Sequence, residues 1–192
     1  MERLRHIIPD ESYEEQAREY IEEHLAYNSQ INGTGGLNRY IDNYSGWLEK
    51  LENDRNMTPN ENRVPADTYF LIRERDNRIV GMLNLRRVLN NQLIRFGGHI
   101  GYGIRPTERR QGYNLINLYL GLLRCQELGL EEVILDCDDN NLGSYRTMER
   151  LGGILINTYY YEDDQCLVRR YVINVNQAIE EHHDEYEPQI IR

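Results

Sequence analysis

The residues with the clearest chemical potential lie in segment 104–114, which reads IRPTERRQGYN. It joins a predicted strand, stopped by Pro106, to a predicted helix that begins near Gly112. A helix start leaves N–H groups unpaired and carries partial positive charge, so it can hold phosphate. Gly112 lets the backbone approach an anion, and Arg109 and Arg110 add charge. The segment alone is equally compatible with a glycine turn that binds nothing.

The elements that must position this segment follow from hydrophobic periodicity. A strand is expected over 98–104, a buried helix over 112–128 closed by Gly129, and a short buried strand over 133–135. A helix over 141–151 and two strands over 154–161 and 166–175, joined at Asp163-Asp164, should follow. These alternating elements predict one compact α/β unit.

The N-terminal third predicts one strand, two amphipathic helices and a hairpin. The strand covers 3–8, and a capping box from Ser12 to Glu15 should open a helix that runs to about Asn28. Helical spacing of apolar residues over 37–51 predicts the second helix. Asn32-Gly33-Thr34-Gly35-Gly36 separates the two helices, as a flexible hinge over a substrate mouth or only as a linker. Asp76-Asn77 should turn a hairpin between two strands.

Composition limits the class of protein. The chain has 192 residues and a net charge of −10, so one domain is expected and nucleic acid, which needs a basic face, is not an expected partner. No apolar run has the length of a membrane span, which is about 18 residues, and no secretory segment opens the chain, so a cytoplasmic protein without a membrane partner is expected. The three cysteines are widely spaced and suggest neither a disulfide framework nor a metal site.

The motifs together resemble the GNAT superfamily of acyl-CoA-dependent N-acyltransferases. The matching pieces are RRQGYN at 109–114, VILDC at 133–137, and NLGS at 141–144 running on to 151–153. Segment 97–102 looks closer still to an uncharacterised bacterial branch of predicted acetyltransferases. The resemblance covers most of 67–173 and fades in the first two helices, where such enzymes tend to select substrates.

The resemblance implies a mixed, mainly antiparallel sheet of six to seven strands with helices on both faces and a splay between the strands at 98–105 and 131–137. It also implies acetyl-CoA as co-substrate, with its pyrophosphate on the amides of 111–114 and its pantetheine arm along the strand at 102–104. The backbone N–H near Ile104 would polarise the thioester carbonyl. The implied cofactor-binding residues are Tyr102, Gly103, Ile104, Arg109, Arg110, Gln111, Gly112, Tyr113, Asn114, Asn141 and Ser144.

Two positions depart from the family pattern. Asn114 stands where Gly or Ala is usual, so its side chain must point away from the phosphate. Met148 stands where many relatives have a tyrosine that protonates the leaving thiolate, and Tyr145 lies about 100° round the helix. Water or another hydroxyl would then have to supply that proton, and Ser144 is expected beside the sulfur.

The general base is assigned to His99, because it begins the strand at a place where some relatives carry a catalytic Glu. The alternative is a structural histidine that is hydrogen-bonded beneath the sheet. Asp136 and Asp138, after the second splayed strand, are weaker candidates for the base.

The sequence therefore predicts one acyltransferase domain over 1–176 and an acidic C-terminal tail over 177–192. The expected reaction is direct transfer of acetyl from acetyl-CoA to a primary amine in a ternary complex, without a metal. The acceptor is open: a small amine, an amino acid, an antibiotic or a peptide N-terminus. The rival is an acyl-CoA-binding module without turnover, and a weaker one is an unrelated phosphate-ligand binder. Homodimers are common in the family, although no sequence feature demonstrates one.

Overall fold

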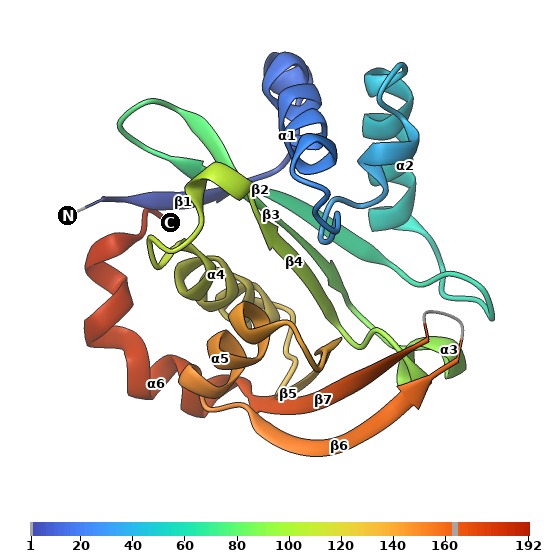
Figure 1. Cartoon of the computed structure of the whole chain (residues 1–192), viewed down its shortest axis with the longest axis vertical. Helices are drawn as coiled ribbons and strands as arrows, with labels where there is room; N and C mark the ends of the chain where they lie inside the picture. Colours follow the sequence, from blue (N-terminus) through green and yellow to red (C-terminus); the bar gives the residue numbers. More distant parts are fainter. Residues whose placement is uncertain (1, 163–164) are drawn as a thin grey trace.

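Two antiparallel sheets carry the fold in the computed structural model, which describes residues 2–162 and 165–192 (Figure 1). The first sheet has the order β1-β2-β3-β4 and the second has the order β5-β7-β6. The strands are β1 (Leu4–Ile7), β2 (Ala66–Arg73), β3 (Arg78–Arg86), β4 (Ile100–Ile104), β5 (Glu132–Asp138), β6 (Ile154–Tyr161) and β7 (Cys166–Asn174). The turn predicted at Asp163-Asp164 lies outside the described residues.

Helices cover both faces of the four-stranded sheet, as Figure 1 shows. One face carries α1 and α2, and the other carries α4, which lies between the two sheets. No helix in the described part of the chain is long and apolar enough to cross a membrane. The helices are α1 (Glu14–Ala26), α2 (Tyr44–Asn56), α3 (Asn91–Arg95), α4 (Tyr113–Glu127), α5 (Leu142–Arg150) and α6 (Val175–Tyr186).

The side chains of β2 point alternately into two hydrophobic cores, one on each face of the sheet. Phe70 and Ile72 are fully buried against α1 and α2, whereas Leu71, between them in sequence, is buried in the core around α4. Successive side chains of a strand point to opposite faces, so a strand between two helical layers is apolar on both sides. This explains why β2 and β3 read as continuous apolar runs around the Asp76-Asn77 turn.

The predicted splay between the two central strands is confirmed. The His99 N–H donates to Ile134 O at 2.7 Å, and an isolated bridge joins Gly98 to Leu135. Beyond this contact β4 and β5 belong to different sheets, and the edge of each is left free over several residues. The described strands therefore form sheets of four and three instead of one continuous sheet.

Local details of the N-terminal helices differ from the sequence expectation. Asp10, not Ser12, is the cap: its carboxylate accepts the Ser12 N–H at 2.8 Å and opens a 3₁₀ turn (Glu11–Tyr13) that leads into α1. The second helix begins at Tyr44, capped by Asn43, because Gly36 adopts a left-handed conformation and only a 3₁₀ turn (Leu37–Arg39) follows it. Apolar spacing over 37–41 thus reflects burial without a regular helix.

The acidic C-terminal segment is packed into the core. Helix α6 contacts α4, and Ala178, Ile179 and Tyr186 are buried there. The last residues return to β1, where the Ile191 N–H donates to Leu4 O at 2.9 Å. The predicted boundary at residue 176 therefore does not coincide with an edge of the hydrophobic core.

Candidate active site

The free edge of β4 presents backbone groups to the gap between the sheets. The Arg105 N–H donates to Val80 O (2.9 Å), and the Arg86 N–H donates to His99 O (2.8 Å). In an antiparallel pair, residues two apart point the same way, so the odd-numbered residues of β4 bond to β3. The backbone groups of Tyr102 and Ile104 consequently face the gap.

A loop with a left-handed residue at each of two positions leads from β4 into α4. Arg110 has a φ of 63° and Gly112 has a φ of 80°. Gly112 is the N-cap of α4 and supplies no side-chain cap, whereas asparagines cap α2, α3, α5 and α6. The first N–H groups of this 15-residue helix are therefore available to an anion, with two arginines beside them.

Buried ion pairs fix the position of this loop. Arg73 reaches across from β2 and donates to Glu108 at 2.6 Å, with both side chains almost fully buried. Glu23 of α1 accepts from the Thr107 N–H (2.8 Å) and from Arg105 (3.2 Å), and these bonds hold the pKa of its carboxyl below the usual range against the effect of burial. Loss of one partner would leave a buried charge without its counter-charge, which is costly. The ion pairs therefore stabilise the loop in this position.

The start of α5 closes the other side of the gap. Asn141 caps this helix by accepting the Ser144 N–H at 3.1 Å. Asn114 of α4 donates to Thr147 Oγ1 at 3.0 Å, which ties the first turns of the two helices together. The amide of Asn114 is thus engaged by α5, as its place in an anion cradle requires.

Two hydroxyl groups meet across the gap, between β4 and the start of α5. Tyr102 Oη lies 2.9 Å from Ser144 Oγ, so a phenol from β4 contacts the N-terminal turn of α5. Burial raises the pKa of Tyr102 well above its usual range, which keeps the phenol protonated at neutral pH. Met148 is buried in the core, and the Tyr145 ring lies against the Arg169 guanidinium, so neither replaces the missing tyrosine.

The cysteine nearest this point is inert. Burial raises the pKa of the Cys137 thiol to about 12, although Ser144 hydrogen-bonds to it. A thiol that stays protonated is a poor nucleophile.

The three candidate bases have different surroundings. Asp136 accepts two bonds from Arg170 (2.8 and 2.7 Å) and one from the Gly97 N–H (2.7 Å), so its oxygens are engaged. Asp138 accepts from Gln30 at 2.8 Å and lines a cavity beside Ser144. His99 lines none of the described cavities.

The ring of His99 is engaged by the backbone of β5. Its Nδ1 accepts the Ile134 N–H at 3.0 Å, which places the proton of the neutral ring on Nε2. Burial, and then the nearby Arg86 charge, lower the pKa of His99. This geometry favours the alternative that His99 is a structural histidine. Its role as the general base stays a prediction.

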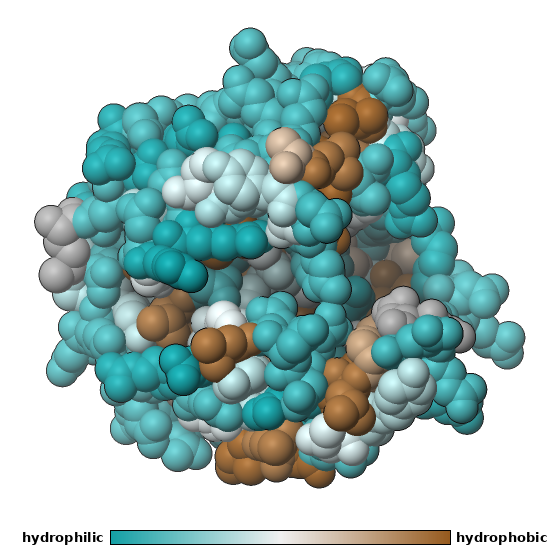
Figure 2. Space-filling view, in the orientation of Figure 1, coloured by the Kyte–Doolittle hydropathy of each residue, from teal (hydrophilic) through white to brown (hydrophobic). Residues whose placement is uncertain are grey.

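Three cavities that share lining residues lie along the gap and beside it. The first, of about 540 Å³, lies over the loop and the starts of α4 and α5. The second, of about 260 Å³, shares Tyr102 and Ser144 with the first and Arg86 and Gly101 with a third. The third, of about 1130 Å³, lies beside α2 and β3. Figure 2 shows the surface hollowed between the helices at the top and the sheet at the bottom.

The first cavity brings together most of the residues expected at the cofactor. Gln111 and His99 do not line it; Gln111 instead donates to Glu108 at 3.1 Å. Sequence reasoning missed Gln30, which follows α1 and carries no motif, and Thr147, one turn after Ser144, and it gave Asn32 no role at the cofactor. The expected residues that line the cavity are Tyr102, Gly103, Ile104, Arg109, Arg110, Gly112, Tyr113, Asn114, Asn141 and Ser144.

Solved acetyltransferases share this fold. Mycobacterium smegmatis RimJ in complex with CoA-disulfide has a TM-score of 0.69 and 11% identity, covering 95% of this chain and 92% of that chain. A Salmonella typhimurium acetyltransferase that modifies the N-terminal serine of ribosomal protein L7/L12 has a TM-score of 0.61 and 16% identity, with 89% and 93% covered. The microcin C7 self-immunity acetyltransferase MccE, in complex with acetyl-CoA and AMP, has a TM-score of 0.62 and 14% identity, with 88% and 91% covered.

Similarity at this level of identity establishes the fold class, and the sequence itself establishes the family. The acetyltransferase (GNAT) domain profile matches residues 1–154, which is most of the chain. The chain therefore belongs to the GNAT acetyltransferase domain family, which confirms the resemblance of its motifs. No curated protein sequence matches the chain.

Proposed function

We propose that this protein transfers an acetyl group from acetyl-CoA to a primary amine by direct attack in a ternary complex. One observation carries the proposal: neighbouring cavities that share lining residues extend from the uncapped start of α4, past the free edge of β4, to a polar cavity beside α2 and β3. A donor and an acceptor entering from opposite ends would meet at Tyr102 and Ser144. Bringing two reactants together in one orientation supplies much of the barrier reduction in such transfers.

The first cavity fits acetyl-CoA in its chemistry. The N–H groups at the start of α4, with Arg109 and Arg110, suit a pyrophosphate, and the free edge of β4 suits the amides of a pantetheine arm. The thioester supplies an activated acyl group. RimJ and MccE, which share the fold, have coenzyme A or acetyl-CoA bound in their structures.

The backbone of β4 can stabilise developing charge on the acyl oxygen. The N–H of Ile104 faces the gap by its register with β3, and the Ile104 C=O, in the next peptide unit, accepts from Arg109 Nε at 3.2 Å. A preorganised N–H donor at such a position contributes roughly 3 kcal/mol to lowering a barrier.

Proton transfers complete the reaction. As the new C–N bond forms and the C–S bond breaks, the attacking nitrogen loses a proton and the departing sulfur gains one. Ser144 Oγ is assigned as the donor to sulfur and regains its proton from the Tyr102 phenol at 2.9 Å. Solvent then returns a proton to Tyr102, as it takes up the proton that the amine has lost, so each group ends the turnover as it began. Asp138, beside the same point, is the better placed carboxylate to receive the proton of the amine, directly or through water.

The test is release of free CoA, followed with a thiol reagent, from acetyl-CoA in the presence of a panel of primary amines. Release that depends on the amine, with one acetyl transferred per CoA, supports the transferase. Binding of acetyl-CoA without amine-dependent release would leave an acyl-CoA-binding module. Equal binding of ATP and CoA would instead indicate an unrelated phosphate-ligand binder.

A further inference from the structure

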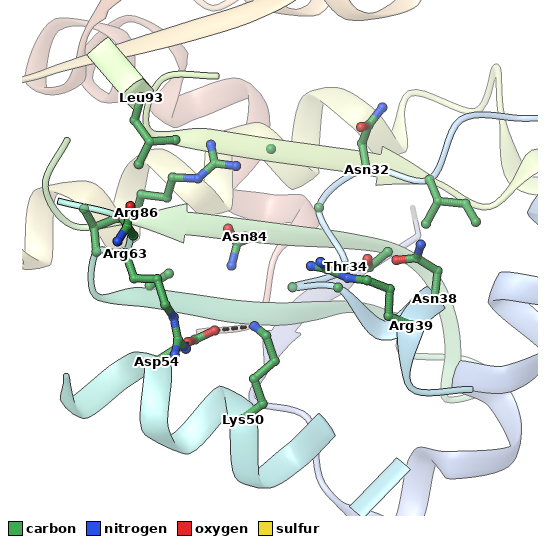
Figure 3. Close-up of a pocket in the computed structure, with 18 of the residues that line it drawn as sticks. Asn32, Thr34, Asn38, Arg39, Lys50, Asp54, Arg63, Asn84, Arg86 and Leu93 are labelled. Carbon is green, nitrogen blue, oxygen red and sulfur yellow. Dashed lines mark hydrogen bonds and ion pairs between the residues drawn. The ribbon is translucent and has the colours of Figure 1, made fainter. Parts of the chain in front are cut away.

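The third cavity is assembled from segments outside the motifs that resemble the family, and one of them is the glycine-rich loop at 32–36. The loop between α1 and α2, helix α2 and strand β3 all contribute to it, and Figure 3 shows their side chains entering the same space. With a volume of about 1130 Å³ it is larger than the cleft over α4. Small-molecule sites typically occupy roughly 300–1,000 Å³, so this cavity can admit a sizeable ligand or a peptide end.

The charge in this cavity is opposite to that of the protein. Its lining carries Arg39, Lys50, Arg63 and Arg86 but only one carboxylate, Asp54, which gives a net charge of +3. The whole chain has a net charge of −10. A concentration of positive charge in the concave part of an acidic protein attracts anions and focuses the field there.

Two of the four cations already share the single carboxylate. Lys50 Nζ and Arg63 Nη2 each contact one oxygen of Asp54, so this group of three keeps a net positive charge. Figure 3 shows Lys50 and Asp54 joined at the floor of the cavity, with Asn84 above them on β3. The ammonium group of Lys50 has further N–H donors for an anion, whereas Asn84 Nδ2 already donates to Thr68 Oγ1 at 3.0 Å and to Asp67 O at 3.3 Å.

The other two cations have no carboxylate partner within 4.0 Å among the described residues. Arg86 is largely buried, and its Nη1 donates only to backbone carbonyls, those of Gly97 at 3.2 Å and Gly98 at 2.9 Å. Arg39 is exposed and extends towards Asn84 in Figure 3. A charge held away from solvent without a partner is costly, and an anionic ligand would offset that cost.

The glycine loop that lines this cavity packs closely against β4. A Cβ on Gly33, which has a φ of 75°, would lie 2.6 Å from the Tyr102 Cα and 2.8 Å from Gly101 O. Only glycine therefore allows the loop to lie directly against β4. This packing holds the loop that carries Arg39 against the strand that carries Tyr102, where a flexible hinge was one of the expectations.

We infer that this cavity binds the acceptor substrate, and that the acceptor carries an anionic group, carboxylate or phosphate, in addition to its reactive amine. The inference rests on the proposed function, since it gives that site its acceptor class. The amine would lie in the small middle cavity near Asp138 and Ser144, and the anionic group would lie among Arg39, Arg86 and Lys50. Amino acids, amino phosphates and acidic peptide N-termini have this arrangement, whereas polyamines do not.

Calorimetry on the protein saturated with CoA, which cannot acetylate, tests this directly. The probes are matched pairs: β-alanine and β-alaninamide, O-phosphoethanolamine and ethanolamine, and an acidic tetrapeptide with its all-amide counterpart. We expect at least one anionic member to bind about tenfold more tightly than its neutral partner, a difference that shrinks with added salt. The pair that shows it identifies a carboxylate, a phosphate or a peptide as the source of the anion.

Variants localise the preference. Arg39→Gln should remove about fivefold or more of the affinity for the preferred anionic probe and leave its neutral partner unaffected, because it deletes one exposed charge without disturbing a buried contact. The control is Arg3→Gln, because Arg3 is exposed and lines none of the described cavities. It should change neither the affinity for the anionic probe nor the affinity for its neutral partner.

The outcomes separate this inference from the proposed function. Lack of any preference for the anionic member in all three pairs would overturn the inference, as would a preference that Arg39→Gln leaves intact. Acetyl-CoA turnover with neutral amines would still stand in that case. Conversely, anion-dependent binding without release of CoA from acetyl-CoA would support the ligand site and contradict the transferase.

Discussion

At the scale of single residues, the central contact is the one between Tyr102 and Ser144. Ser144 and Asn141 could be named from the sequence because the resemblance to the GNAT family implies them at the start of this helix. The partnership with Tyr102 could not be predicted, since it joins residues 42 apart through the approach of β4 and α5. The family position occupied by Met148 indicated a missing acid, but only the three-dimensional contact indicates which hydroxyl is near.

Removing either hydroxyl should slow the chemical step. We expect Ser144→Ala and Tyr102→Phe each to lower kcat about tenfold or more, because proton delivery to the leaving sulfur is impaired. The affinity for acetyl-CoA, measured by calorimetry, should stay within about twofold. Tyr145→Phe, one residue further along α5, is the matched control and should retain full kcat. A fully active Tyr102→Phe variant would exclude the relay.

The role of His99 can be separated by two substitutions. In His99→Asn the amide oxygen can take the place of Nδ1 and still accept the Ile134 N–H, so we expect kcat/KM within about threefold of wild type. His99→Ala leaves that N–H without its partner and should lower the free energy of unfolding by about 1–3 kcal/mol. A tenfold loss of kcat/KM in His99→Asn, with acetyl-CoA affinity intact, would restore His99 as the general base.

At the scale of elements, periodicity predicted the strands and helices that are regular and buried, and failed where burial occurs without regular structure. The helix over 112–128 was well predicted because Gly112 and Gly129 flank it and its apolar face is complete. The second helix was predicted to begin too early, since Leu37 is buried from a 3₁₀ turn. Capping also depends on tertiary placement, as the role of Asp10 shows.

The contact between β1 and α4 should make stability depend on pH. His6 Nε2 lies 2.8 Å from Asn117 Oδ1, and burial lowers the pKa of His6 to about 4, from about 6.5 in the unfolded chain. Between these two pH values the unfolded chain binds a proton at His6 and the folded chain does not. The contribution of His6 to the free energy of unfolding is therefore complete above pH 6.5. It falls by about 3 kcal/mol as the pH drops towards 4.

Urea unfolding at pH 7 and at pH 4.5 measures this difference. His6→Gln removes the titrating group, so its loss of stability over this interval should be smaller than that of the wild type. The exposed His183→Gln variant is the control and should lose as much stability over this interval as the wild type does. Burial also lowers the pKa of His24, but this contribution is the same in the wild type and both variants. Equal pH dependence in His6→Gln and wild type would contradict the assignment.

At the scale of the whole molecule, net charge and composition are averages over the chain, whereas the fold places charged and apolar residues unevenly. The end of the chain was expected to be a tail because it is acidic, yet several of its apolar residues are buried against α4, and its last residues bond to β1. Likewise, the net negative charge gave no sign of a cationic cavity, whose four cationic residues come from four separate segments. Neither feature has a local sequence pattern.

The contribution of α6 to stability can be measured with one pair of variants. Ile179 is buried between α6 and the core, so Ile179→Ala should lower the free energy of unfolding by about 2–4 kcal/mol. Glu180→Ala, at the neighbouring exposed position, should change it by less than about 0.5 kcal/mol. If Ile179→Ala were as stable as wild type, the C-terminal segment would be a dispensable tail.

The most direct test of an acetyl-CoA site at the start of α4 is calorimetric binding of acetyl-CoA to Gly112→Asp and Gly129→Asp. The two glycines flank the same helix, have φ values of 80° and 74°, and have open space at the Cβ position, so backbone strain is matched. We expect Gly112→Asp to weaken the binding of acetyl-CoA about tenfold or more, because the new carboxylate lies in the pyrophosphate site and repels the pyrophosphate. Gly129→Asp should bind acetyl-CoA as tightly as the wild type does. Equal affinities in all three proteins, or no binding to the wild type, would contradict the assignment of this cleft to acetyl-CoA.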